Sequence, residues 1–140
     1  MKQIPVIFWT GTGNTQMMAD AVAEAINAAG AEAVVKNVSE ISADEAAGYD
    51  ALALGCPAMG AEVLEECEFE PFFTELEGNL AGKKVALFGS YGWGGTYMQD
   101  WEARVKDAGA TLVADGVLAL GAPDDEAMTK LAEAGKLLAE

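Results

Sequence analysis

The chain has 140 residues, 51% of them hydrophobic, and its 23 acidic against 8 basic residues give a formal net charge of −15. This length and composition predict one globular domain, residues 1–140, built around a single core. The charge argues against nucleic acids and anionic membranes as partners, because their phosphates would be repelled, and favours partner proteins with a basic docking face.

Two further features of the composition bear on chemistry and location. The sequence contains no histidine, the usual proton carrier near neutral pH, which argues against acid–base or triad catalysis. Cys56 and Cys67 lack metal-type spacing and are predicted to be buried free thiols. No apolar run is long enough to span a membrane, and residues 1–5 lack an apolar signal core. We therefore expect a cytoplasmic protein without catalytic residues or metal ligands.

The first half of the chain alternates between strands and helices. Strands are predicted over residues 5–9, 33–37 and 51–55. The first should begin at Pro5, which cannot donate to a sheet ladder, and its apolar run without alternation is typical of a parallel strand covered on both faces. A helix is predicted from the loop after this strand to about Ala29, with Gly30 as its C-cap. A short helical turn over residues 42–47 is capped by Ser42 and Glu45.

The second half continues the alternation. The segment from Val63 to Leu76 is predicted to bury one apolar face, and its helix should begin near or after Pro71. That face consists of Leu64, Phe69, Phe72, Phe73 and Leu76. A strand over 85–89 is followed by a helix ending near Gly109. Residues 111–114 and 117–120 form a last strand pair or one bulged strand. The final helix should turn Met128, Leu131 and Leu138 inward. This pattern predicts a three-layer α/β fold, in which a parallel sheet has helices on both faces and ligands bind beyond the carboxyl ends of the strands.

The loop after the first strand, Thr10-Gly11-Thr12-Gly13-Asn14-Thr15, is typical of an anion cradle at a helix N-terminus. No Lys or Arg occurs between Lys2 and Lys36, so a phosphate bound there would have only neutral donors. The nucleotide P-loop motif fails because it requires a Lys, and the dinucleotide fingerprint fails because Gln16 occupies the place of its third glycine. A simple turn joining strand to helix remains the alternative.

Two later loops also follow strands and should meet the first. Residues 56–62 offer Met59, Gly60 and Glu62, and residues 90–95 place Tyr91 and Trp93 among glycines. A phosphate site at one end with aromatic and thioether faces at the other suits a planar heterocycle on a phosphorylated tail. Flavin mononucleotide (FMN) has that shape.

The chain resembles a known family, the flavodoxins, over essentially its whole length. The resemblance is carried by Phe8-Trp9-Thr10-Gly11-Thr12-Gly13-Asn14-Thr15, Gly55-Cys56-Pro57-Ala58-Met59-Gly60, Leu64-Glu65-Glu66, Glu70-Pro71-Phe72 and residues 83–94. These segments are similar to the short-chain type of anaerobic bacteria. The resemblance, and not the pattern of the residues, implies a flavodoxin-like five-stranded doubly wound sheet of order 2-1-3-4-5. The sequence departs from the family pattern at Ala61 and near Gly121, where relatives often carry polar residues.

The resemblance also implies a non-covalent FMN site made by the three loops. Its residues would be Thr10, Gly11, Thr12, Gly13, Asn14 and Thr15 around the phosphate, and Pro57, Ala58, Met59, Gly60, Ala61, Glu62, Ser90, Tyr91, Gly92, Trp93 and Gly94 around the ring and ribityl chain. Trp93 would stack on one face of the flavin and Met59 would cover the other. The backbone at Gly60 would face the flavin N5 atom, and Glu62 would lie near N3.

The implied function is that of a low-potential one-electron carrier, and not an enzyme, shuttling between neutral semiquinone and anionic hydroquinone. Gly60 could turn its carbonyl toward a protonated N5. Repulsion from an acidic region would make the second couple strongly reducing, since no Lys or Arg occurs from Asn37 to Gly82. The acids of that region are Glu62, Glu65, Glu66, Glu68, Glu70, Glu75 and Glu77. The protein is expected to be a monomer that serves ferredoxin- or flavodoxin-dependent oxidoreductases or reductases.

Two other functions fit the same fold. A flavin-dependent NAD(P)H-quinone or azo reductase would need room for a nicotinamide against the ring, where Trp93 is expected, and the negative charge would repel NADPH. A phospho-acceptor signalling domain would carry paired acids after the first strand, whereas Phe8-Trp9-Thr10 has none.

Overall fold

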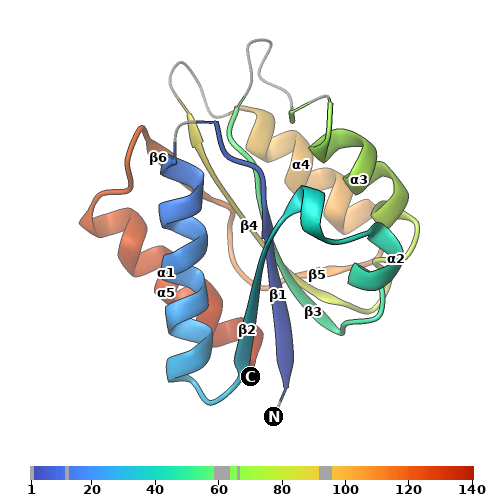
Figure 1. The fold of residues 1–140 in the computed structure, drawn as a ribbon, viewed down its shortest axis with the longest axis horizontal. Coiled ribbons are helices and arrows are strands. Elements are labelled where there is room, and N and C mark those ends of the chain that lie inside the picture. The colour runs from blue at the N-terminus through green and yellow to red at the C-terminus, as the bar shows by residue number, and fades with distance from the viewer. Residues whose placement is uncertain (1, 12, 59–63, 66, 92–95) are drawn as a thin grey trace.

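The computed structural model describes residues 2–11, 13–58, 64–65, 67–91 and 96–140. Its centre is a parallel sheet with strand order β2-β1-β3-β4-β5, and β6 also pairs with β4 (Figure 1). The strands are β1 (Gln3–Phe8), β2 (Glu32–Asn37), β3 (Ala51–Gly55), β4 (Lys84–Tyr91), β5 (Thr111–Leu112) and β6 (Val117–Leu120). The predicted fold class and strand order are confirmed.

The last strand position is divided between two short strands. β5 pairs with the beginning of β4, at Lys84 and Val85, and β6 pairs with its end, from Phe88 to Tyr91. Both pairings are parallel, so β5 and β6 follow one another along the same edge of β4. The interruption covers residues 113–116. It includes Asp115 and Gly116, where it was predicted, but β5 ends at Leu112 and not at Ala114.

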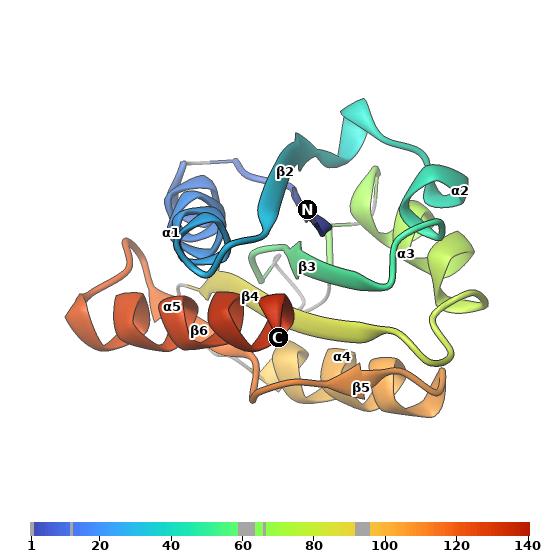
Figure 2. The same cartoon turned by 90° about the horizontal axis from the view of Figure 1, so that it is seen from below.

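The helices cover both faces of the sheet (Figure 2). They are α1 (Asn14–Ala28), α2 (Ala43–Ala46), α3 (Phe69–Glu77), α4 (Thr96–Asp107) and α5 (Asp125–Ala139), with a 3-10 turn η1 (Val38–Glu40) after β2. One buried cluster joins α1 and α5 to the sheet, and a second joins α2, α3 and α4 to the opposite face. In β1, Val6 and Phe8 belong to the first cluster and Ile7 to the second. That division explains why this strand is apolar without alternation.

Several element boundaries differ from prediction for identifiable reasons. β1 begins at Gln3, two residues before Pro5, because its pairing with β2 already starts at Gln3. Pro5 does not interrupt the strand, since the pairing of β1 with β3 starts only at Val6 and the missing N–H of Pro5 is not needed for it. α3 begins at Phe69, which places Pro71 in the first turn, where helical N–H groups have no intrahelical acceptor. β4 continues through Ser90 and Tyr91, which were expected in a loop, because β6 pairs with both.

Two predicted burials are wrong. Met128 is 41% exposed because the buried face of α5 is formed by Ala127, Leu131, Ala134, Gly135 and Leu138, and Met128 lies beside that stripe. Cys67 is also exposed, whereas Cys56 is buried as expected. Cys67 precedes α3 in a turn, and it is Phe69 that enters the core. Among the described residues, no helix combines the length and hydropathy needed to cross a membrane.

Candidate functional site

The carboxyl ends of β1, β3 and β4 lie together at one edge of the sheet, the upper edge in Figure 1. Backbone hydrogen bonds join the segments that leave them. The N–H of Trp9 donates to Gly55 O at 3.0 Å, and the N–H of Ala58 donates to Ser90 O at 2.9 Å. The structure therefore brings together the described parts of all three predicted site loops.

At the start of α1, the described part of the first loop places no capping side chain on the helix N–H groups. Gly13 is the N-cap residue, with φ of 92°, a left-handed conformation that favours glycine. Its N–H donates to Thr10 Oγ1 at 3.0 Å, which closes the turn. Gly13 has no side-chain acceptor for the first turn of the helix, and that turn contains no acidic residue. The N–H groups and the helix dipole are thus free to bind an anion.

A buried pair of hydroxyls joins this helix to β4. Thr15 Oγ1 lies 3.2 Å from Ser90 Oγ, and the two residues are 1% and 6% exposed. Only one of the two hydroxyl hydrogens is used within the pair. Among the described residues the other hydrogen has no acceptor, so it can be donated to a group bound between α1 and the end of β4.

Trp9 packs beside the first loop and connects it to α3. Its indole Nε1 donates to Glu68 Oε1 at 3.3 Å. A Cβ added to Gly11 would lie 3.2 Å from the Trp9 ring, so the backbone of Gly11 approaches the indole closely. The Trp9 indole therefore packs against the backbone of the first loop at Gly11.

The acidic region from Glu62 to Glu77 presents fewer free surface charges than its sequence indicates. Arg104 pairs with Glu70 and with Glu77, at 2.7 and 3.1 Å, so neither is a free surface charge. Glu65 is only 5% exposed and is used within the chain. Glu68 and Glu75 are exposed. Glu62 and Glu66 lie outside the described residues.

The ionisation of Glu65 is fixed by its surroundings. Burial opposes the charged form. Hydrogen bonds from the backbone N–H groups of Phe69, Glu68 and Cys67 outweigh that cost and hold the pKa of Glu65 below its usual range. The carboxylate therefore caps α3, a role that the sequence analysis did not assign.

Nine of the predicted site residues lie at this edge: Thr10, Gly11, Gly13, Asn14, Thr15, Pro57, Ala58, Ser90 and Tyr91. The other eight lie outside the described residues: Thr12, Met59, Gly60, Ala61, Glu62, Gly92, Trp93 and Gly94. The contacts expected from Trp93 and Met59 with the ring thus stay predictions.

The sequence analysis did not identify Tyr97 and Gly89, which contact the backbone of Cys56 where the second loop begins. The hydroxyl of Tyr97 donates to the backbone oxygen of Cys56 at 2.7 Å, and both residues are buried. A Cβ at Gly89 would overlap both of these oxygen atoms, so only glycine fits there. No local signal identifies Tyr97, because its partner is a backbone carbonyl 41 residues away.

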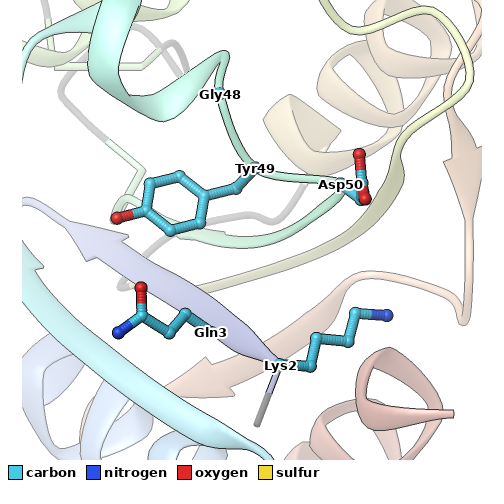
Figure 3. Close-up of a pocket in the computed structure, with 5 residues that line it drawn as sticks. All are labelled: Lys2, Gln3, Gly48, Tyr49 and Asp50. Atoms are coloured by element: carbon cyan, nitrogen blue, oxygen red, sulfur yellow. The ribbon is translucent and has the colours of Figure 1, made fainter.

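A shallow hollow of about 380 Å³ lies at the opposite edge of the sheet (Figure 3). Lys2, Gln3, Gly48, Tyr49 and Asp50 line it. They come from the beginnings of β1 and β3, far from the carboxyl ends of the strands. The hollow is therefore separate from the candidate site.

The fold and this edge define a doubly wound α/β protein whose ligand site suits a phosphorylated cofactor. A family model described as Flavodoxin matches residues 6–135. The chain belongs to the flavodoxin family. It is accordingly an FMN-containing, low-potential electron carrier rather than an enzyme, and it acts with redox protein partners.

Individual relatives agree with the family match. The chain is 47% identical to a flavodoxin of Clostridium beijerinckii, with 96% of this chain and 97% of that protein covered. It is 46% identical to a flavodoxin of Megasphaera elsdenii over 82% of this chain and 85% of that protein. The solution structure of two-electron reduced Megasphaera elsdenii flavodoxin superimposes with a TM-score of 0.90, at 42% identity and with 97% and 98% of the two chains covered.

The donors described above fit the phosphate of FMN. The start of α1 supplies N–H groups without a capping side chain, and Thr15 with Ser90 supplies a spare buried hydroxyl hydrogen. All of these donors are neutral, so binding depends on their number and on the helix dipole.

Proposed function

We propose that FMN binds across the carboxyl edge of the sheet, with its phosphate on residues 10–15 and its ring between the second and third loops. The observation that carries this placement is the start of α1. Gly13 leaves the first N–H groups uncapped, and the buried Thr15–Ser90 pair lies directly behind them. Thr10, Thr12 and Asn14 complete a neutral donor set for the phosphate.

The ring contacts in this proposal come from the other two loops. Trp93 covers one face of the flavin and Met59 the other, which keeps water from the ring. The backbone of Gly60 accepts a hydrogen bond from the ring edge, and a glycine is suited to that position because its peptide can turn freely. When bound, FMN supplies the redox chemistry, taking up and releasing one electron at a time.

The proposed partners are redox proteins with basic docking faces. Support comes from the net charge of −15 and from Glu68, an exposed acid whose carboxylate contacts Trp9 beside the first loop. We further propose that the chain acts in the cytoplasm as a monomer, with residues 1–140 forming one FMN-binding unit.

Comparing FMN with riboflavin tests where the phosphate binds, because riboflavin has the same ring and no phosphate. Thr15→Val removes a buried hydroxyl at nearly constant volume. A hydrogen bond to a charged group contributes about 1.5–3 kcal/mol, so FMN affinity should fall about ten- to hundredfold while riboflavin affinity changes little. Thr129→Val is the matched control, since Thr129 is exposed on α5, where its hydroxyl donates to Asp125 O.

Equal weakening of FMN and riboflavin by Thr15→Val would contradict the placement of the phosphate. The electron count is tested separately by anaerobic stepwise reduction of the holoprotein, followed by visible spectroscopy. Two separated one-electron steps are expected, whereas a single two-electron step with NAD(P)H as donor would contradict the carrier mechanism.

A further inference from the structure

Cys56, the residue after β3, is fixed by hydrogen bonds from three different parts of the chain. Its N–H donates to Phe88 O of β4 at 3.1 Å. Its carbonyl oxygen accepts from the Tyr97 hydroxyl of α4 at 2.7 Å. Its Sγ accepts from the N–H of Glu65 at 3.3 Å and lies 3.5 Å from Pro57 O. Cys56 is completely buried, so water does not compete for these bonds.

Two of these partners, Glu65 and Tyr97, are themselves held by further contacts. The Glu65 carboxylate accepts from the N–H groups of Cys67, Glu68 and Phe69, at 2.7 to 2.9 Å, in the turn that leads into α3 and at its first residue. Tyr97 is 2% exposed, and its ring stacks on Trp101 with centroids 6.5 Å apart. Burial raises the pKa of Tyr97, which keeps its hydroxyl protonated as a donor.

These contacts join the two flanks of the second cofactor loop. The loop begins directly after Cys56, with residues 57–58, and it ends at Leu64, directly before Glu65. The hydrogen bond from Glu65 N–H to Cys56 Sγ therefore joins the two ends of the loop. Tyr97 ties the same point to the start of α4, which follows the third loop. Residues 59–63 themselves lie outside the described ranges.

We propose that Tyr97, Cys56 and Glu65 form a clasp that positions the flanks of the second loop and thereby tunes the affinity and reduction potentials of FMN. This inference rests on the proposed FMN site. The three act as positioning residues at the base of the loop. A change in their geometry is transmitted through Pro57, Ala58 and Leu64 to the segment that faces the ring.

Two substitutions separate the hydrogen bonds of the clasp from its packing. Tyr97→Phe deletes only the hydroxyl, and Cys56→Ala deletes the sulfur acceptor. Each should weaken FMN binding about two- to tenfold, the range expected for one net hydrogen bond. Each should also shift at least one of the two one-electron potentials by up to about 60 mV, since a tenfold change corresponds to about 59 mV. Cys56→Ser restores an acceptor and should recover most of both effects.

Tyr49→Phe is the matched control, because Tyr49 lines the hollow at the opposite edge of the sheet. A second measurement needs no cofactor chemistry. In a Cys67→Ser background, the reaction of Cys56 with a thiol reagent should be slow, because burial raises the pKa of Cys56 to about 12. Tyr97→Phe should accelerate that reaction several-fold.

The inference is overturned if Tyr97→Phe and Cys56→Ala bind FMN and are reduced as the wild type is. It is also overturned if Cys56→Ser is as impaired as Cys56→Ala, since packing and not hydrogen bonding would then explain the loss. Failure of the wild-type protein to bind FMN would instead refute the proposed site, so the two failures are distinguishable.

Discussion

The guanidinium of Arg104 on α4 forms a two-pronged hydrogen-bonded pair with the carboxylate of Glu70 on α3, at 2.7 and 2.9 Å. The same guanidinium bonds Glu77 at 3.1 and 3.2 Å and lies 4.7 Å from the centre of the Phe73 ring. Arg104 therefore links the helix that follows the second loop to the helix that follows the third. It also neutralises part of the acidic region.

Replacing Arg104 should loosen this link. Arg104→Met keeps an aliphatic chain over Phe73 but removes the ion pairs, and we expect the free energy of unfolding to fall by about 1 kcal/mol. The value is modest because the three charged side chains are each about one-third exposed and solvent screens the pairs. Urea unfolding measures the change. Lys106→Met, which removes an exposed charge two residues away, should have a much smaller effect, and equal losses in the two variants would contradict the assignment.

Much of the fold could be predicted because its signals are local. β3 and the cap of α2 by Ser42 and Glu45 were predicted correctly, since an apolar run between turn residues and a capping box each lie within a few residues. The ends of two helices were predicted to within two residues, because Gly30 and Gly109 adopt positive φ directly after them. α1 ends at Ala28, with Ala29 and not Gly30 as its C-cap, and α4 ends at Asp107. The burial of Met128 was mispredicted because one residue of helical phase decides which side chain faces the core.

The location of the candidate site could be predicted for the same reason. Residues 10–15 are consecutive, and the structure places their described members at the start of α1, while phosphate binding by them stays a prediction. Glu65 was assigned to the acidic surface, although its carboxylate is buried against backbone N–H groups. Tyr97 was not identified at all. In both cases the partners are backbone atoms, one in a local turn and the other distant in sequence, and backbone partners leave no pattern of residue types.

The cap of α3 by Glu65 predicts a dependence of stability on pH. Glu65→Gln keeps the shape but loses the charge and one of the two acceptor oxygens, and should cost about 1–3 kcal/mol near neutral pH. The folded-state pKa of Glu65 is lowered, so its contribution is fully present above the unfolded glutamate pKa of about 4.3 and is lost as the pH falls through the folded value. Chemical unfolding of both proteins from pH 7 to pH 3 should show the difference shrinking.

Glu75→Gln, at an exposed position of the same helix, provides the control and should change stability little at any pH. A difference between wild type and Glu65→Gln that persists undiminished at the lowest pH would show that the carboxylate charge is not what stabilises α3.

The close packing of α1 on α5 depends on Gly135. A Cβ at this position would lie 2.7 Å from Val22 O and 2.9 Å from Ala25 Cβ, and the backbone oxygen cannot move aside. Gly135→Ala should therefore lower the free energy of unfolding by about 1–2 kcal/mol, although alanine is the better helix former by about 1 kcal/mol. Gly78→Ala is the control because Gly78 has helical φ and open space around it. Thermal unfolding should show a lower midpoint only for Gly135→Ala.

Electron transfer to a basic partner should depend on acids near the cofactor edge and not on net charge alone. Glu68→Gln keeps an acceptor oxygen for the Trp9 indole but removes one charge beside the first loop. Asp50→Asn removes one charge at the opposite edge of the sheet. With cytochrome c as a basic acceptor, stopped-flow rates should fall as salt rises, because exposed charges are screened beyond about 8–10 Å. At low salt Glu68→Gln should be about twofold slower than Asp50→Asn. Equal rates for the two variants, or rates independent of salt, would show that the acidic residues at this edge do not guide docking.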